Sequence, residues 1–85
     1  MHTRTGGCLC GSVRYELLGE PRANVVCHCT HCKKQSGGSF SFNLLIRQED
    51  YRQSGHTMTY IDRGDSGHPV LREFCPRCGS PILSR

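Results

Sequence analysis

The sequence predicts an all-β fold of short, curved antiparallel sheets. Apolar and polar residues alternate along several short segments, as in strands with one buried face. No segment keeps the 3.6-residue period of an amphipathic helix. The chain has 85 residues, so we expect one domain over residues 1–85. Its core should be too small to be stable without disulfides, a bound metal ion or a partner subunit.

Three strands are expected in the first half of the chain. Val13–Leu17 alternates apolar and polar residues, and Val25–Cys27 is a short β-branched run. Phe40–Ile46 shows the clearest alternation of the whole sequence. We expect the aromatic rings of Phe40 and Phe42 to lie in the core.

Three more strands are expected in the second half. A turn at Gln53–Gly55 precedes a strand over His56–Ile61. The segment Asp62–His68, with two glycines and two aspartates, is expected to be a loop. A strand over Val70–Phe74 and a short one at Ile82–Leu83 complete the prediction.

The seven cysteines indicate whether disulfides or a bound metal ion stabilise the chain. An odd number cannot close entirely into disulfides within the chain. Residues 1–20 show no secretory signal and no stretch could span a membrane, so we expect a cytoplasmic protein. Thiols stay reduced in the cytoplasm, and this favours metal binding.

Two of the three cysteine motifs supply two thiolates each. Cys8-Leu9-Cys10-Gly11 places its sulfurs on one side if the backbone is extended, with Leu9 facing elsewhere. Cys75-Pro76-Arg77-Cys78-Gly79 has the spacing of a zinc knuckle. Together they complete a tetrahedral structural site, the four-cysteine cluster (Cys8, Cys10, Cys75, Cys78). One ion there would close a loop of about seventy residues.

The motif Cys27-His28-Cys29-Thr30-His31-Cys32 supplies three more thiolates, the three-cysteine cluster (Cys27, Cys29, Cys32). Three protein ligands and an open fourth position are typical of catalytic zinc. A fourth ligand from His28 or His31 would instead close the site; His28 should face away from Cys27 and Cys29, whereas His31 is harder to exclude. At most one short helix is expected after this motif, over Lys33–Ser36.

A protein with one zinc and three spare thiols is a further alternative. The formal net charge of +4 suggests an anionic partner. With seven thiolates and two zinc ions, however, the loaded chain would carry about +1. The basic residues are scattered and only Lys33 and Lys34 are adjacent, so a nucleic-acid partner is not expected.

The three motifs also resemble those of a known family. The segments are Gly6-Gly7-Cys8-Leu9-Cys10-Gly11-Ser12-Val13-Arg14-Tyr15, the run from Cys27 to Gly37, and Arg72-Glu73-Phe74-Cys75-Pro76-Arg77-Cys78-Gly79-Ser80. In this order they are similar to the glutathione-dependent formaldehyde-activating enzyme family, also called the centromere protein V domain. The likeness runs across residues 6–83.

The resemblance implies an Mss4-like β fold with two zinc ions. It assigns the four-cysteine cluster to a structural zinc, and Cys27, Cys29 and Cys32 to a catalytic zinc. The implied activity is a carbon–sulfur lyase chemistry, in which glutathione or another small thiol adds to formaldehyde or a similar aldehyde. Fold and metal transfer between relatives more safely than substrate does.

One departure from the family is the C-terminus, since relatives usually continue for about thirty residues beyond the third motif. The chain could thus be a fragment, a minimal member, or a chain that completes itself with a partner, and a homo-oligomer is one such case. A further alternative is a truncated, inactive relative whose second site is empty. The alternative to an enzyme is a non-catalytic zinc module for a protein or nucleic-acid partner. Near the second motif, Gly37-Gly38-Ser39 could admit a peptide-like ligand, and Lys33 and Lys34 could meet its carboxylates.

Overall fold

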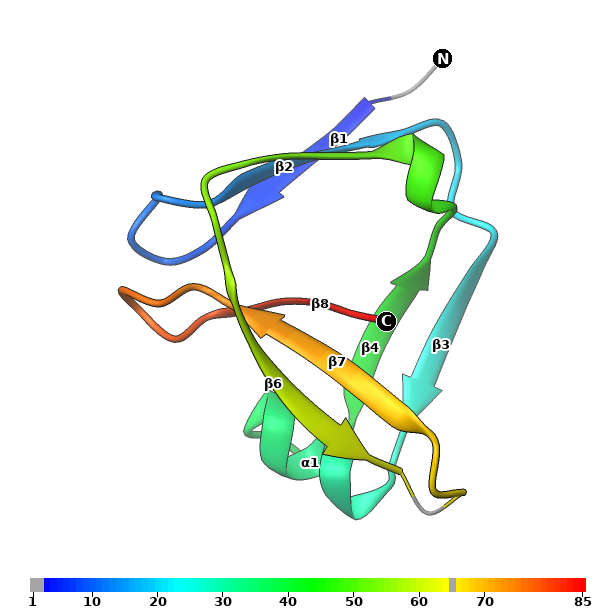
Figure 1. Cartoon of the computed structure of the whole chain (residues 1–85). Coiled ribbons are helices and arrows are strands. Elements are labelled where there is room, and N and C mark those ends of the chain that lie inside the picture. The colour runs from blue at the N-terminus through cyan, green and yellow to red at the C-terminus, as the bar shows by residue number, and fades with distance from the viewer. Residues whose placement is uncertain (1–2, 65) are drawn as a thin grey trace. The chain divides into compact units, whose positions relative to one another are not determined.

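The structure, a computed structural model, describes residues 3–64 and 66–85 (Figure 1). Strands dominate this part of the chain, in small antiparallel sheets, so the prediction of a mainly β protein is confirmed. The elements in chain order are β1 (Thr3–Gly7), β2 (Arg14–Leu18), β3 (Ala23–Cys27), α1 (Thr30–Ser36), β4 (Ser41–Leu45), the 3₁₀-helix η1 (Gln48–Asp50), β5 (Tyr51–Ser54), β6 (Met58–Arg63), β7 (Pro69–Phe74) and β8 (Pro81–Ser84).

The strands form three sheets, with the orders β1-β2-β5, β3-β4 and β6-β7-β8. The chain divides into two compact units. One contains the described residues up to Thr5 together with Tyr15–Arg52; the other contains Gly6–Arg14 and Gln53–Arg85. Each cysteine cluster lies within a single unit. The expectation of one domain over residues 1–85 stays a prediction.

In the first unit, the antiparallel ribbon β3–β4 carries α1 at one end (Figure 1). The helix begins at Thr30, three residues earlier than expected, because the Cys29 side chain accepts a hydrogen bond from the Cys32 backbone and caps the first turn. It ends where Gly37 takes a left-handed conformation, with φ of 73°. The short helix thus turns the chain from β3 into β4.

In the second unit, β7 is the middle strand between β6 and β8. The expected loop is shorter than predicted because Asp62 and Arg63 continue β6, pairing with Val70 and Pro69 of β7. Asp62 can remain in the strand because its carboxylate accepts hydrogen bonds from the Arg63 backbone and the Arg72 side chain. Aspartate is frequent in loops, but it does not predict a loop where, as here, neighbouring strand residues donate hydrogen bonds to its carboxylate.

Two strands, β1 and β5, were not expected from the sequence. Gln53 and Ser54 belong to β5, so the predicted turn is confined to Gly55. Gly55 has a φ of 82°, and a Cβ atom there would collide with the Ser12 carbonyl oxygen. Neither strand alternates clearly between apolar and polar residues, and a pattern search therefore misses both.

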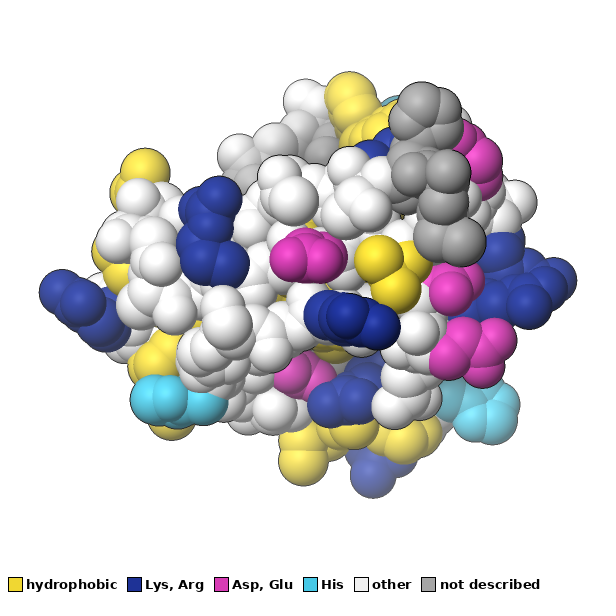
Figure 2. Space-filling model, turned by 90° about the horizontal axis from the view of Figure 1, so that it is seen from above, with side chains coloured by type: hydrophobic (Ala, Val, Ile, Leu, Met, Phe, Trp, Pro, Cys, Tyr) yellow, Lys and Arg dark blue, Asp and Glu magenta, His cyan; other side chains and the backbone are white. Residues whose placement is uncertain are grey.

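The buried core is built around cysteine rather than around aromatic rings. Val13 and Cys75 are almost fully buried, Cys8 packs with them, and Ile82 lies against this cluster. The expectation that Phe40 and Phe42 are core residues is wrong, because they are 47% and 60% exposed. Phe40 precedes β4, and Phe42 lies in the two-stranded ribbon β3–β4, on a face whose apolar side chains are exposed. Hydrophobic side chains also reach the surface on the face drawn in Figure 2.

Candidate metal centres

The sulfur atoms of the four-cysteine cluster all lie within 4.8 Å of one another. The sulfurs of Cys8 and Cys10 are 3.6 Å apart, and those of Cys10 and Cys75 are 3.7 Å apart. Four sulfurs placed tetrahedrally at the usual Zn–S bond length would be about 3.8 Å apart. The donor set and its spacing therefore fit a tetrahedral thiolate-bound ion such as Zn²⁺.

The first motif reaches this arrangement through a turn, and the expectation of an extended backbone is wrong. The Gly11 N–H donates to the Cys8 carbonyl at 3.2 Å, and the Cys8 N–H donates to the Val13 carbonyl at 3.0 Å. Gly11 has a φ of 85°, which allows the chain to fold back on itself. The Leu9 side chain is 88% exposed, so it does face away from the cluster as expected.

The third motif forms the expected turn. The Gly79 N–H donates to the Cys75 carbonyl at 2.8 Å, and the Cys75 N–H donates to the Ser80 carbonyl at 2.9 Å. Gly79 has a φ of 76°, close to that of Gly11. The two motifs thus bring their sulfurs together with similar local geometry, although they lie at opposite ends of the sequence.

Hydrogen bonds shift the pKa values of these thiols by different amounts and in different directions. Ser80, through its hydroxyl and backbone N–H, and the backbone of Cys10 lower the pKa of Cys78 to about 5. The Val13 backbone N–H is the main cause that lowers the pKa of Cys8 to about 7. The pKa of Cys10 is raised: Ser12 lowers it, but partial desolvation of the sulfur by its neighbours and the hydrogen bonds shared with Cys8 and Cys75 outweigh this effect. Four close sulfurs cannot all ionise easily without a cation between them.

Two hydroxyl groups touch this cluster that sequence reasoning missed. Ser12 Oγ lies 3.1 Å from the Cys10 sulfur and 3.3 Å from that of Cys75. Ser80 Oγ lies 3.1 Å from the Cys78 sulfur. The sequence did hold a signal for them, because Cys-Gly-Ser occurs at residues 10–12 and again at residues 78–80.

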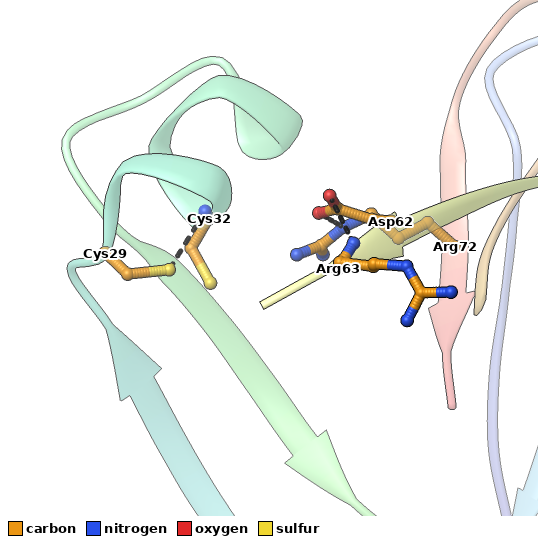
Figure 3. Close-up of polar contacts among 5 residues, drawn as sticks. All are labelled: Cys29, Cys32, Asp62, Arg63 and Arg72. Atoms are coloured by element: carbon orange, nitrogen blue, oxygen red, sulfur yellow. Dashed lines mark hydrogen bonds and ion pairs between the residues drawn. The ribbon is translucent and has the colours of Figure 1, made fainter. Parts of the chain in front are cut away.

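The sulfurs of the three-cysteine cluster also lie within 4.8 Å of one another. Cys27 ends β3, Cys29 caps α1, and Cys32 lies in the first turn of that helix. The Cys32 N–H donates to the Cys29 sulfur at 3.3 Å, and Figure 3 shows the two sulfurs side by side. Cys29 is exposed and the other two are half-buried, so this cluster is more open to solvent than Cys8 and Cys75 are.

Neither histidine of the second motif belongs to this set of ligand atoms. The His28 ring instead contacts the Phe40 ring, with centroids 5.6 Å apart. Cys27 is paired with Ser41 at the end of the β3–β4 ribbon, and His28 and Phe40 are the next residues beyond this pair. The expectation that His28 faces away from the sulfurs is thereby supported, and the arrangement favours three protein ligands.

The other residues singled out near the second motif lie on or after α1. Lys33 and Lys34 are in the last turn of the helix, where their charge complements its C-terminal end. Gly37 ends the helix, and the Gly38 N–H donates to the Ser36 hydroxyl at 3.3 Å. These contacts explain the local fold. Ligand binding by these residues stays a prediction.

A comparison with known protein families gives an independent result. The family model described as glutathione-dependent formaldehyde-activating enzyme matches residues 3–85 of the chain. The match includes both cysteine clusters and every described residue. In the described part of the chain, no helix has the length and apolar character needed to cross a membrane.

Proposed function

The chain belongs to the glutathione-dependent formaldehyde-activating enzyme family, and we propose that it is a zinc-dependent carbon–sulfur lyase. The reaction would join a small thiol, glutathione in the first instance, to formaldehyde or a similar aldehyde. The thiolate sulfur attacks the carbonyl carbon, a C–S bond forms, and the carbonyl oxygen takes up a proton. The reverse direction breaks the same C–S bond.

The observation that carries this proposal is the three-cysteine cluster. It offers three sulfurs to one ion, and the group of ligand atoms includes no histidine of its motif, so a bound zinc ion would have a fourth position for a substrate thiol. Zinc bound there would lower the pKa of a thiol at that position and keep it in the reactive thiolate form. Cys27, Cys29 and Cys32 would hold the ion, and α1 fixes the positions of the last two.

The four-cysteine cluster would hold a second, structural zinc. Its set of four thiolates is complete, and Cys8 and Cys75 are buried at the centre of the core. A cytoplasmic location, where these thiols stay reduced, is part of the same proposal. Association into a homo-oligomer remains a prediction.

The first experiment counts metal and thiols on freshly reduced protein and follows the reaction by NMR with ¹³C-formaldehyde and glutathione. We expect two zinc ions per chain, and exchange between free and glutathione-bound formaldehyde that is faster than the spontaneous rate. Cys29→Ala should remove one zinc ion and the added exchange. One zinc ion with three titratable thiols in the unmodified chain, or no acceleration, would contradict the proposal.

A non-catalytic zinc module is the second candidate, and the exposed ribbon β3–β4 favours it. Val26, Phe42 and Leu44 are 40–60% exposed on one face of that ribbon. An uncovered apolar face is typical of a protein partner. A nucleic-acid partner is less suited, because the Lys and Arg residues are scattered along the sequence and only Lys33 and Lys34 are adjacent. Zinc in both clusters without any effect of glutathione would favour this candidate.

A further inference from the structure

We propose that Ser12 and Ser80 are positioning residues of the four-cysteine cluster, each donating its hydroxyl hydrogen to a metal-bound thiolate. This inference rests on the proposal that the cluster holds zinc. Four thiolates around Zn²⁺ leave a net charge of −2, and hydrogen bonds to the sulfurs offset part of that charge. A metal-bound thiolate can only accept hydrogen bonds, so at the observed distances the serine hydroxyls must be the donors.

The strongest support is that the same local structure occurs twice. In each Cys-Gly-Ser segment the glycine has a positive φ, 85° at Gly11 and 76° at Gly79. Each serine hydroxyl then lies 3.1 Å from the sulfur two residues before it. Two segments more than sixty residues apart reach one geometry, which indicates a shared role at the metal.

Ser80 also connects the two halves of the cluster. Its oxygen accepts a hydrogen bond at 3.1 Å from the backbone N–H of Leu9, between the cysteines of the first motif. With the oxygen held by Leu9, the hydroxyl hydrogen remains available for the Cys78 sulfur. Ser80 therefore orients one ligand and fixes the distance between the two ligand loops.

Ser12 has a different set of neighbours. Its hydroxyl lies 3.1 Å from the Cys10 sulfur, 3.3 Å from that of Cys75 and 3.8 Å from that of Cys8, so its neighbours come from both motifs. It has one hydrogen to share between them, and its side chain is exposed, so water can partly replace it. We expect the hydroxyl of Ser12 to matter less than that of Ser80.

The second motif contains no Cys-Gly-Ser segment. Its last cysteine, Cys32, is followed by two lysines, and the Cys29 sulfur accepts from the Cys32 backbone. The hydroxyl donors thus mark the four-cysteine cluster as the site built to retain its ion. The three-cysteine cluster, with Cys29 exposed, is the one suited to exchange a ligand.

The test measures metal affinity in the full chain carrying Cys29→Ala, so that the four-cysteine cluster is read alone. Zinc is titrated against a chelator, and Co²⁺ replaces zinc for absorption spectroscopy. We expect Ser80→Ala to weaken zinc binding by about tenfold or more, and Ser12→Ala by a smaller factor. Loss of the hydrogen bond should also move the sulfur-to-cobalt charge-transfer band to lower energy, which a purely structural role would not do.

Ser80→Thr and Ser12→Thr keep the hydroxyl and should restore both affinity and spectrum. Ser84→Ala, in β8 of the same unit, is the matched control and should change neither. Unchanged affinity and band position in both alanine variants would overturn this inference while leaving the proposed function intact. If the cluster binds no metal even with both serines present, the proposal of a structural zinc fails instead.

Discussion

Cys78 and Cys10 belong to the same cluster, but the pKa values of their thiols differ. The hydroxyl and backbone N–H of Ser80 lower the pKa of Cys78 to about 5, whereas the pKa of Cys10 is raised. The cause is local, since the sulfur that receives the best-placed donors ionises first and then disfavours ionisation of its neighbours. The structure thus gives chemically equivalent residues different reactivities.

This difference can be measured on metal-free, reduced protein. At pH 6 we expect iodoacetamide to modify Cys78 faster than Cys10, because the thiolate is the nucleophile and only the lowered pKa supplies it at that pH. Peptide mapping by mass spectrometry at increasing reaction times gives both rates in one sample.

Exposure alone makes the opposite prediction for this pair. Cys10 is exposed and Cys78 is half-buried, so access would favour Cys10. Faster modification of Cys10 at pH 6 would show that the hydrogen bonds to Cys78 do not lower its pKa in solution. The Ser80→Ala variant is the control, and it should slow modification of Cys78 at this pH.

The strands β6 and β7 are held together by a largely buried ion pair. Arg72 Nε donates to Asp62 Oδ2 at 2.9 Å, and the Arg63 backbone N–H donates to Asp62 Oδ1 at 2.8 Å (Figure 3). The two side chains are only 13–14% exposed. Asp62 is paired with Val70 of β7, and Arg72 lies two residues further along that strand, so Asp62 and Arg72 are diagonal neighbours on one face of the sheet. At this burial, loss of one partner leaves the charge of the other without its counter-charge.

A double-mutant cycle with Arg72→Met and Asp62→Asn should measure this coupling. We expect a coupling free energy of about 1–3 kcal/mol in urea unfolding of the metal-loaded chain. The exposed pair Arg47–Glu49, with side chains 56% and 74% exposed, is the control and should couple by less than about 0.5 kcal/mol. Equal coupling in the two cycles would mean that burial of the Asp62 pair adds no stability.

The proposed function assigns the two cysteine clusters different tasks: the four-cysteine cluster would stabilise the fold, and the three-cysteine cluster would bind the substrate thiol. The four-cysteine cluster lies at the core of one unit, with Val13 and Ile82 packed around Cys75. The three-cysteine cluster lies at the end of a ribbon in the other unit, with no buried residue in its helix. Loss of metal should therefore have different consequences at the two places.

This difference predicts the behaviour of two single-cysteine variants. Cys78→Ala should unfold the unit that contains it, since metal binding there supplies free energy of folding to a small core. Cys29→Ala should lose one zinc ion and keep the fold. Zinc counting with circular dichroism and amide hydrogen exchange distinguishes the outcomes. Identical behaviour of the two variants would contradict the division into structural and catalytic sites.

The sequence by itself determined the features that depend on local pattern. Alternating residues located β2 and β4, and the spacing of the cysteines separated a group of four from a group of three. The same spacing indicated that His28 is not a ligand of the three-cysteine cluster, and the group of ligand atoms does not include it. These predictions succeeded because strand periodicity and ligand spacing are set by the backbone over a few residues.

Only the tertiary structure decided what lies beyond a few residues. It exposed Phe40 and Phe42 on an uncovered ribbon, placed Cys75 at the centre of the core, and added β5 where a turn was expected. It also brought Ser80 to the backbone of Leu9, seventy-one residues away. Burial and long-range hydrogen bonds depend on which distant segments pack against each other. The pattern of residues a few positions apart does not specify that packing.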